Sequence, residues 1–204
     1  MVQSLSMDDL PDVVNTSARD ELLHRVMAHV RANGVTETSL RQIADAIGSS
    51  HRMLLYHFGS REGLLTDVIR AVEADQRARW RSLPADLDQI GVLRRMWRHF
   101  TRPELEANER LFFEIYGQAL QGRDGATELL DGIVDDWVDP VAAAAVRRGV
   151  PKPQARADAR LAVAVVRGLL LDLLATGDRR AVNAAFERYV TLVAAPETER
   201  QVAV

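Results

Sequence analysis

Four side chains near the middle of the run TSLRQIADAIGSSHRMLLYHFGSREGLL, residues 38–65, are suited to binding a nucleic acid: His51, Arg52, Tyr56 and His57. The apolar residues around them can pack inward, which leaves these four for an outer face. Arginine and histidine donors near the start of a helix suit hydrogen bonds to base edges and phosphates. The chemistry that this spacing indicates is DNA recognition.

Two short helices would position these side chains. Residues 40–47 repeat apolar residues at helical spacing, and Ser39 with Gln42 forms a capping box in front of them. A second helix is predicted at 51–57, after a tight turn at Gly48-Ser49. This is the helix-turn-helix pattern, whose second helix enters the major groove.

Helices are also predicted on either side of this pair. One spans residues 18–32, with Ser17 as its N-cap and Asp20 three residues later. After a break at Gly59-Ser60, a long helix runs to about Trp80. Apolar residues of the short helices are expected to pack on the helix at 18–32.

The full run resembles the DNA-binding domain of TetR-family transcriptional regulators. The matching landmarks are Ile43-Ala44, Gly48, Ser50, His57-Phe58 and Ser60-Arg61-Glu62-Gly63-Leu64. The run GLLLDLLATGD, residues 168–178, is similar to the penultimate helix of that family. The resemblance implies a homodimeric all-α protein, most often a repressor that leaves DNA when a small molecule fills its C-terminal domain.

The resemblance also implies individual DNA contacts. Arg41 matches a guanine-reading arginine, and His51 and Arg52 match base-reading positions. The set of expected DNA-binding residues is Ser39, Arg41, Ser50, His51, Arg52, Tyr56, His57 and Arg61. Ser39, His57 and Arg61 match phosphate contacts, and Ser50 matches the cap of the second helix. Arg41 and Arg61 could instead be solvated surface charges, and His51 could simply face solvent. Tyr56 could pack on the helix at 18–32 instead of contacting DNA.

Two positions depart from the family pattern. Met53 and Leu55 stand where the family often has threonine and tyrosine, so two expected phosphate contacts are lost. Tyr56, one position later, could replace one of them. These two replacements bear on which operator sequence is read more than on whether DNA is bound.

The remainder of the chain also reads as helix, which predicts an all-α protein of about nine helices. The expected segments are 86–100, 103–120, 126–148, 153–175 and 179–193, with Pro140 kinking or splitting the third near Asp139. The predicted organisation is a disordered segment at 1–16, a helix-turn-helix DNA-binding domain at 17–63, a ligand-binding and dimerisation domain at 64–196, and a tail at 197–204.

Aromatic residues gather where the family encloses its ligand. Pockets are usually apolar with a few placed polar groups. The candidate ligand-binding residues are Trp97, His99, Phe100, Phe112, Tyr116 and Trp137. Phe112 and Tyr116 are also spaced as ordinary core residues. The ligand would be a small apolar or amphipathic molecule.

The last two long helices, about 153–175 and 179–193, are expected to form the dimer. Residues 161–174 are apolar almost all round, and pairing with a two-fold mate would bury that surplus in a four-helix bundle. The alternative is a central helix of a monomer. A two-fold dimer would place two recognition helices roughly 34–36 Å apart over a palindromic operator in double-stranded DNA.

Composition excludes several other classes. The 204-residue chain has no cysteine and a net charge of −3, while residues 17–61 carry six arginines against four acids. There is no apolar run long enough for a membrane span, no nucleophile–base motif, no metal pair and no glycine-rich phosphate loop. We therefore expect a cytoplasmic regulator without cofactor, metal or catalytic residues. The alternatives are a DNA-binding regulator without effector and, far behind, a small helical enzyme or carrier.

Overall fold

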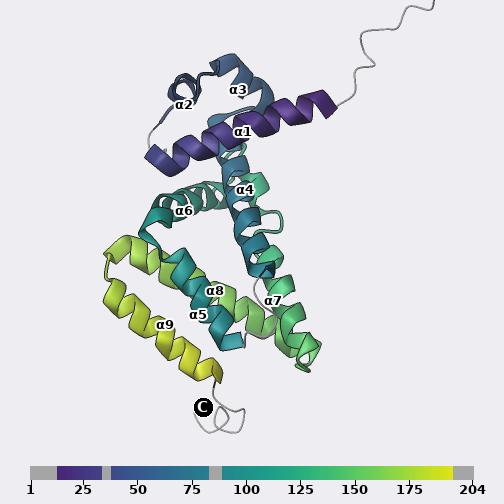
Figure 1. The fold of residues 1–204 in the computed structure, drawn as a ribbon, viewed down its shortest axis with the longest axis vertical. Helices are drawn as coiled ribbons and strands as arrows, with labels where there is room; N and C mark the ends of the chain where they lie inside the picture. The colour runs from purple at the N-terminus through teal and green to yellow at the C-terminus, as the bar shows by residue number, and fades with distance from the viewer. Residues whose placement is uncertain (1–12, 34–37, 83–88, 195–204) are drawn as a thin grey trace, which may run out of the picture.

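The computed structural model describes residues 13–33, 38–82 and 89–194, and every regular element within these ranges is helical (Figure 1). The all-α prediction is confirmed. The elements are α1 (Val13–Asn33), α2 (Leu40–Ala46), α3 (His51–Phe58), α4 (Arg61–Arg81), α5 (Gln89–Phe100), η1 (Pro103–Leu105), α6 (Glu106–Leu120), η2 (Thr127–Leu130), α7 (Asp135–Arg147), α8 (Lys152–Thr176) and α9 (Arg179–Ala194).

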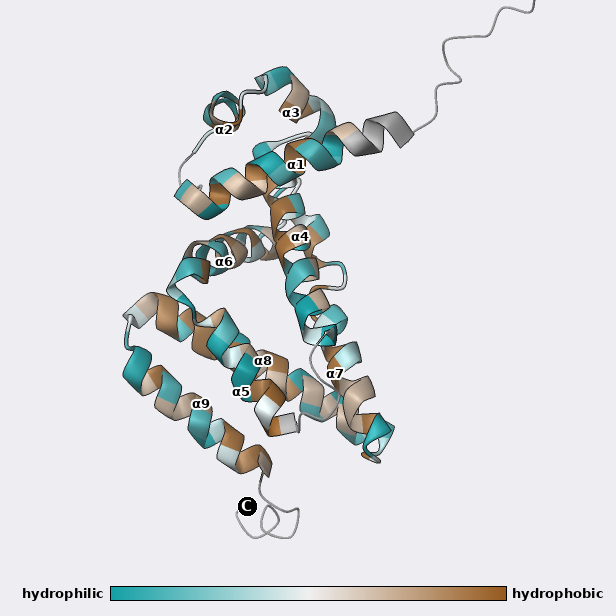
Figure 2. Cartoon of the chain, in the orientation of Figure 1, coloured by the Kyte–Doolittle hydropathy of each residue, from teal (hydrophilic) through white to brown (hydrophobic). Residues whose placement is uncertain are grey.

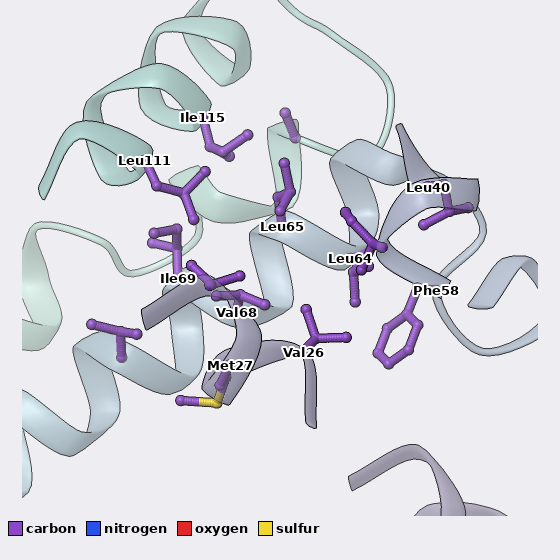
Figure 3. Packing of buried hydrophobic residues seen from close by; sticks show 14 of the residues in the cluster. Val26, Met27, Leu40, Phe58, Leu64, Leu65, Val68, Ile69, Leu111 and Ile115 are labelled. Atoms are coloured by element: carbon purple, nitrogen blue, oxygen red, sulfur yellow. The ribbon is translucent and has the colours of Figure 1, made fainter. Parts of the chain in front are cut away.

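Helices α1, α2 and α3 form one end of the molecule, and α4 leads from them into the body (Figure 1). The body contains α5 to α9. A single apolar core joins the two parts, because buried residues of α1, α3 and α4 continue into Leu111 and Ile115 of α6 (Figure 3). The predicted boundary at residues 63 and 64 therefore falls at the start of α4, a helix whose buried residues belong to this shared core.

Two further clusters hold the body together. Trp97 of α5 stacks on Phe186 of α9 with ring centroids 4.6 Å apart, and Leu170 of α8 joins them. Alanines and valines of α7 and α8 form the other cluster, in which small side chains allow close helix packing. The second and third clusters thus join α5, α7, α8 and α9, and α8 contributes to both.

Most predicted helix bounds differ from the structure by one or two residues, but two predictions were wrong. Helix α1 begins at Val13, so Ser17 lies inside the helix and is not its N-cap. The segment 126–148 does not break near Asp139, since α7 is continuous through Pro140. The interruption lies earlier, between η2 and α7, where Gly132 has a φ of 74°. Pro140 is tolerated because it follows the first turn of α7 and removes a single helical hydrogen bond.

Several predictions fall on residues outside the described ranges. These are residues 1–12 of the predicted disordered segment, the tail at 197–204, and the start of the fifth helix at 86–88. The helix that was expected from residue 86 is described from Gln89. In the ranges that are described, no helix combines the length and the apolar character needed to cross a membrane.

Candidate DNA-binding surface and ligand cavity

The helix-turn-helix is fixed by its caps. Ser39 and Gln42 form the predicted capping box at α2: the Ser39 backbone N–H donates to Gln42 Oε1 over 2.8 Å, and the Gln42 N–H donates to Ser39 Oγ over 3.3 Å. Ser50 Oγ accepts a hydrogen bond of 3.1 Å from the Met53 N–H at the start of α3. These caps satisfy backbone donors that a helix N-terminus leaves free, so both short helices begin at defined residues.

The turn between α2 and α3 needs a glycine. Gly48 has a φ of 65°, a left-handed conformation that costs other residues about 1–2 kcal/mol. Arg25 of α1 reaches the same turn and donates to the Ile47 carbonyl. The guanidinium thus satisfies a carbonyl at the end of α2 and ties the turn to α1.

One face of α3 is open to solvent. Leu54 and Phe58 are buried in the core, whereas His51 and Arg52 are exposed in the first turn and Tyr56 is 70 % exposed. The structure thus brings three of the predicted DNA contacts onto one accessible surface. Most of the Tyr56 side chain is open to solvent, and its ring makes an edge contact with the His57 ring at 4.9 Å between centroids.

The exposed face of α3 also carries the two departures from the family pattern. Met53 is 41 % exposed and Leu55 is 40 % exposed. Apolar side chains on a helix that enters the major groove can contact thymine methyl groups. Their exposure is compatible with base reading and does not indicate a role in the core.

The other predicted DNA-binding residues are placed less uniformly. Arg41 is exposed on α2, and the Ser39 hydroxyl is engaged in its capping box. His57 is half-buried, and its Nε2 atom is buried without a hydrogen-bond partner among the described residues. A phosphate contact by this histidine would therefore need its other nitrogen or a change of rotamer.

Arg61 makes contacts inside the protein. Its Nε donates to the Thr38 carbonyl over 2.7 Å, and its Nη1 lies 3.7 Å from Glu114 Oε1 of α6. The same guanidinium therefore touches the segment before α2, the start of α4 and the body. Sequence reasoning placed Arg61 at a phosphate and did not anticipate this bridge.

An apolar cavity lies within the body. It has a volume of about 90 Å³ and is in part open to solvent. Its lining residues come from five helices, α4 to α8: Glu73, Gln76, Trp80, Leu93, Met96, Phe100, Glu109, Phe112, Phe113, Trp137, Val141, Ala162, Val163, Val166, Arg167 and Leu170. A wider hollow beside the α7–α8 connection shares Trp80, Leu93, Val141 and Ala162 with it.

Three of the six predicted ligand-binding residues line this cavity: Phe100, Phe112 and Trp137. The other three lie outside its lining. Trp97 faces α9, where its Nε1 donates to Asn183 Oδ1 over 2.8 Å. Tyr116 packs on Phe112 at 5.5 Å, and the His99 ring lies 5.8 Å from that of Phe100.

Sequence reasoning missed the charged groups of the cavity, Glu73, Glu109 and Arg167. Glu73 is 9 % exposed and Glu109 is 8 % exposed. Trp137 Nε1 donates to Glu73 Oε2 over 2.5 Å, and Arg167 Nη2 lies 3.8 Å from the same oxygen. The available signal was the position of both acids on the apolar faces of α4 and α6, where a solvated charge would not be expected.

Burial controls the titration of these groups. Desolvation is the main cause that raises the pKa of Glu73, and its contact with Trp137 opposes the rise. Burial and, secondly, the nearby Glu73 raise the pKa of Glu109 from 4.5 to about 7. The cavity therefore holds a carboxyl group that changes its charge near neutral pH.

A capped helix-turn-helix with an exposed second helix and a helical body with an apolar cavity together define a two-part helical fold. The sequence model described as "Bacterial regulatory proteins, tetR family" matches residues 28–68, from the second half of α1 to the first turns of α4. The match covers α2, α3 and the adjoining ends of α1 and α4, so the similarity to that family is shown for the helix-turn-helix. A comparison with curated proteins gives no match.

Solved structures share this fold along most of the chain. A transcriptional regulator from Rhodococcus sp. RHA1 has a TM-score of 0.69 at 16 % identity, with 85 % of this chain and 94 % of that chain covered. A TetR-family regulator from Pectobacterium atrosepticum has a TM-score of 0.66 at 16 % identity, with 91 % and 94 % covered. The multidrug binding protein EbrR complexed with imidazole has a TM-score of 0.64 at 20 % identity, with 96 % and 100 % covered.

Proposed function

We propose that the chain is a homodimeric repressor that binds a palindromic operator through α3 and leaves it when a small apolar or amphipathic molecule fills the cavity. The main support for this proposal is that α4 contributes both to the core beneath the helix-turn-helix and to the wall of the cavity. The first turns of α4 pack in the same core as α1 and α3, and Glu73, Gln76 and Trp80 near its other end line the cavity. A ligand can therefore act on the helix that supports the DNA-binding end.

In this proposal the exposed face of α3 reads bases. His51 and Arg52 occupy the first turn, where donors reach base edges, and Tyr56 lies one turn further along the same face. Arg41 on α2 contacts DNA beside them. Ser39, Ser50, His57 and Arg61 are the proposed backbone contacts or caps. The protein acts in the cytoplasm, where its DNA is.

The dimer is proposed to form through α8 and α9. Exposed residues of α8 follow a three-and-four spacing, namely Leu161, Ala164, Gly168, Leu171 and Ala175. Such a stripe is typical of a helix that packs on another helix, and Gly168 has nothing within 4 Å of an added Cβ. On α9, Leu192 is 51 % exposed. Hydrophobic colouring extends over much of α8 (Figure 2). Pairing across a two-fold axis would cover this surface.

Selection of random-sequence DNA by the purified chain tests the proposal. The expected result is an enriched palindrome that is bound by two chains, with Arg52→Ala weakening binding by roughly 5- to 150-fold at fixed salt, the equivalent of a lost base contact. Arg147→Ala removes the same charge from an exposed position on α7 and should leave operator binding unchanged. Release of the labelled operator duplex by added compounds then tests the effector part.

Two outcomes would contradict the proposal. The absence of an enriched sequence, with weak and strongly salt-dependent binding, would indicate only non-specific electrostatic attraction. Equal losses for Arg52→Ala and Arg147→Ala would show that α3 is not the reading surface. Measurement at several salt concentrations separates these cases, since a phosphate contact lowers the salt slope and a base contact changes sequence preference.

A further inference from the structure

The charged groups buried around the cavity are unevenly paired. Arg167 donates to the Ile133 carbonyl over 2.7 Å, lies 3.8 Å from Glu73 Oε2, and stacks over the Phe112 ring with its Cζ 5.2 Å from the centroid. Arg77 lies 3.2 Å from Asp136 and 3.8 Å from Glu73. Both guanidinium groups therefore have carboxylate partners.

Glu109 has no such partner. Gln76 Nε2 donates a long hydrogen bond of 3.4 Å to Glu109 Oε1, and no cation lies within ion-pair distance of Glu109 among the described residues. At 8 % exposure it lines the cavity, so water cannot fully replace the missing partner. A buried carboxylate without a cation is costly, and a partner that arrives with the ligand would remove this cost.

The other lining residues indicate what kind of apolar group the rest of that ligand would carry. Phe112 and Phe113 follow Glu109 by one turn of α6, and Phe100 contacts Trp137 edge to face at 5.8 Å. Aromatic rings attract cations through their faces and apolar groups through dispersion. The site therefore offers, within an aromatic surface, one carboxyl group that has no cationic partner.

We propose that the cavity binds an organic cation, a protonated amine with an apolar body, whose charged nitrogen pairs with Glu109. The inference rests on the proposed ligand-released regulator and specifies the chemistry of its effector. An anion is disfavoured because it would meet Glu73 as well as Glu109, while Arg167 is already engaged with Glu73. A neutral apolar molecule would leave Glu109 buried and unpaired.

The titration of Glu109 supports the assignment. Its carboxyl is faced by Glu73 and Gln76 from α4 and by Arg167 from α8. Three further arginines border the crevice that Glu109 shares with the α6–α9 side: Arg102, Arg110 on its own helix, and Arg179. Arg110 pairs with Glu106 and Arg179 donates to the Thr101 carbonyl. Burial and Glu73 outweigh Arg167 and raise the pKa of Glu109 to about 7, so an arriving cation replaces a proton.

Three probes with one apolar body test the charge preference: 4-phenylbutylammonium, 4-phenylbutanol and 4-phenylbutanoate. Each is titrated into the full chain at pH 8 by calorimetry, with quenching of Trp80 and Trp137 fluorescence as a second readout. The expected result is binding of the ammonium at least tenfold tighter than the alcohol and the carboxylate. Glu109→Gln should weaken ammonium binding by roughly 10- to 100-fold, as for a lost charged hydrogen bond, and change alcohol binding by less than threefold. Glu104→Gln, on the exposed surface of η1, is the matched control.

The outcomes separate this inference from the proposed function. Equal binding of all three probes, or tightest binding of the alcohol, would overturn the cation assignment and leave a ligand cavity in place. Tightest binding of the carboxylate would overturn it in favour of Arg167. A preference for the ammonium that survives Glu109→Gln would refute the role of this residue. Binding of none of the probes would refute the cavity as an effector site of this size, whereas operator binding would be unaffected.

Discussion

Glu109→Gln should stabilise the protein at alkaline pH. Glutamine keeps the shape of the side chain and its contact with Gln76 but carries no charge that must be desolvated. In the wild type, the folded state retains a proton on Glu109 up to a pKa of about 7, whereas the unfolded chain releases it near the ordinary value of 4.5. An acid whose pKa is raised by folding lowers stability as pH rises between these two values.

The size of the effect follows from the linkage relation. The rise of the pKa corresponds to about 3 kcal/mol of unfolding free energy once pH is well above 7, and about 2–3 kcal/mol of this develops between pH 5 and pH 8. The difference in free energy of unfolding, Glu109→Gln minus wild type, should grow by this amount over that range. Glu73 also has a raised pKa, but it titrates in both proteins and contributes little to the difference.

Urea denaturation followed by circular dichroism at pH 5, 6, 7 and 8 measures the difference, at one protein concentration because a dimer makes stability concentration-dependent. Glu104→Gln should show a difference that does not change with pH. A flat or falling difference for Glu109→Gln would show that the Glu109 carboxyl is not held protonated by burial. Both the origin of the titration and its link to cation binding would then be refuted.

Three more predictions follow from named contacts. The affinity for 4-phenylbutylammonium should rise roughly tenfold from pH 6 to pH 8 in calorimetry, since Glu109 must lose its proton to pair with the cation, and it should not change in Glu109→Gln. Leu171→Glu should give a folded monomer in sedimentation velocity and should weaken operator binding. Ala143→Glu, at an exposed position on α7, should leave the dimer intact. A dimeric Leu171→Glu protein would exclude the exposed surface of α8 as the dimer interface. Gly48→Ala should lower the free energy of unfolding by about 1–2 kcal/mol because of its φ of 65°, while Gly117→Ala inside α6 should be neutral or stabilising, and equal effects would contradict this.

The helices of the DNA-binding end could be predicted because local signals determine them. The capping box at Ser39, the cap at Ser50 and the turn at Gly48 each depend on residues within a few positions of one another. The start of α1 at Val13 was missed since Ser17 is only a weak signal: a good capping residue also occurs inside helices.

The cavity was harder to predict because its lining comes from five helices that are far apart in the sequence. Aromatic composition located the region, but it could not distinguish Phe112, which lines the cavity, from Trp97, which stacks on Phe186. That difference depends on the direction of packing, which is set by long-range contacts. Glu109 was not among the candidate residues, although its place on the apolar face of α6 indicates burial.

The position of the cavity between two cores explains how a ligand could reach the DNA-binding end. Phe112 on one wall belongs to the core shared by α1 to α4 and α6, whereas Phe100 and Leu170 belong with α5, α8 and α9, and Phe113 packs against both cores. Separating α6 from α1 or α4 would expose buried side chains such as Leu111 at about 1.5–3 kcal/mol each.

A bound cation could favour a different relative position of these two walls. The walls would then move as rigid units, because each core is packed too closely to deform within itself. Movement of α6 would then carry α4 with it, and the contacts of Arg61 with Glu114 and the Thr38 carbonyl extend this connection to the start of α2. Since α8 and α9 would be fixed in the dimer, the displacement would appear as a changed distance between the two α3 helices. The operator requires roughly 34–36 Å between them, so a change in their separation would cost base contacts on both half-sites.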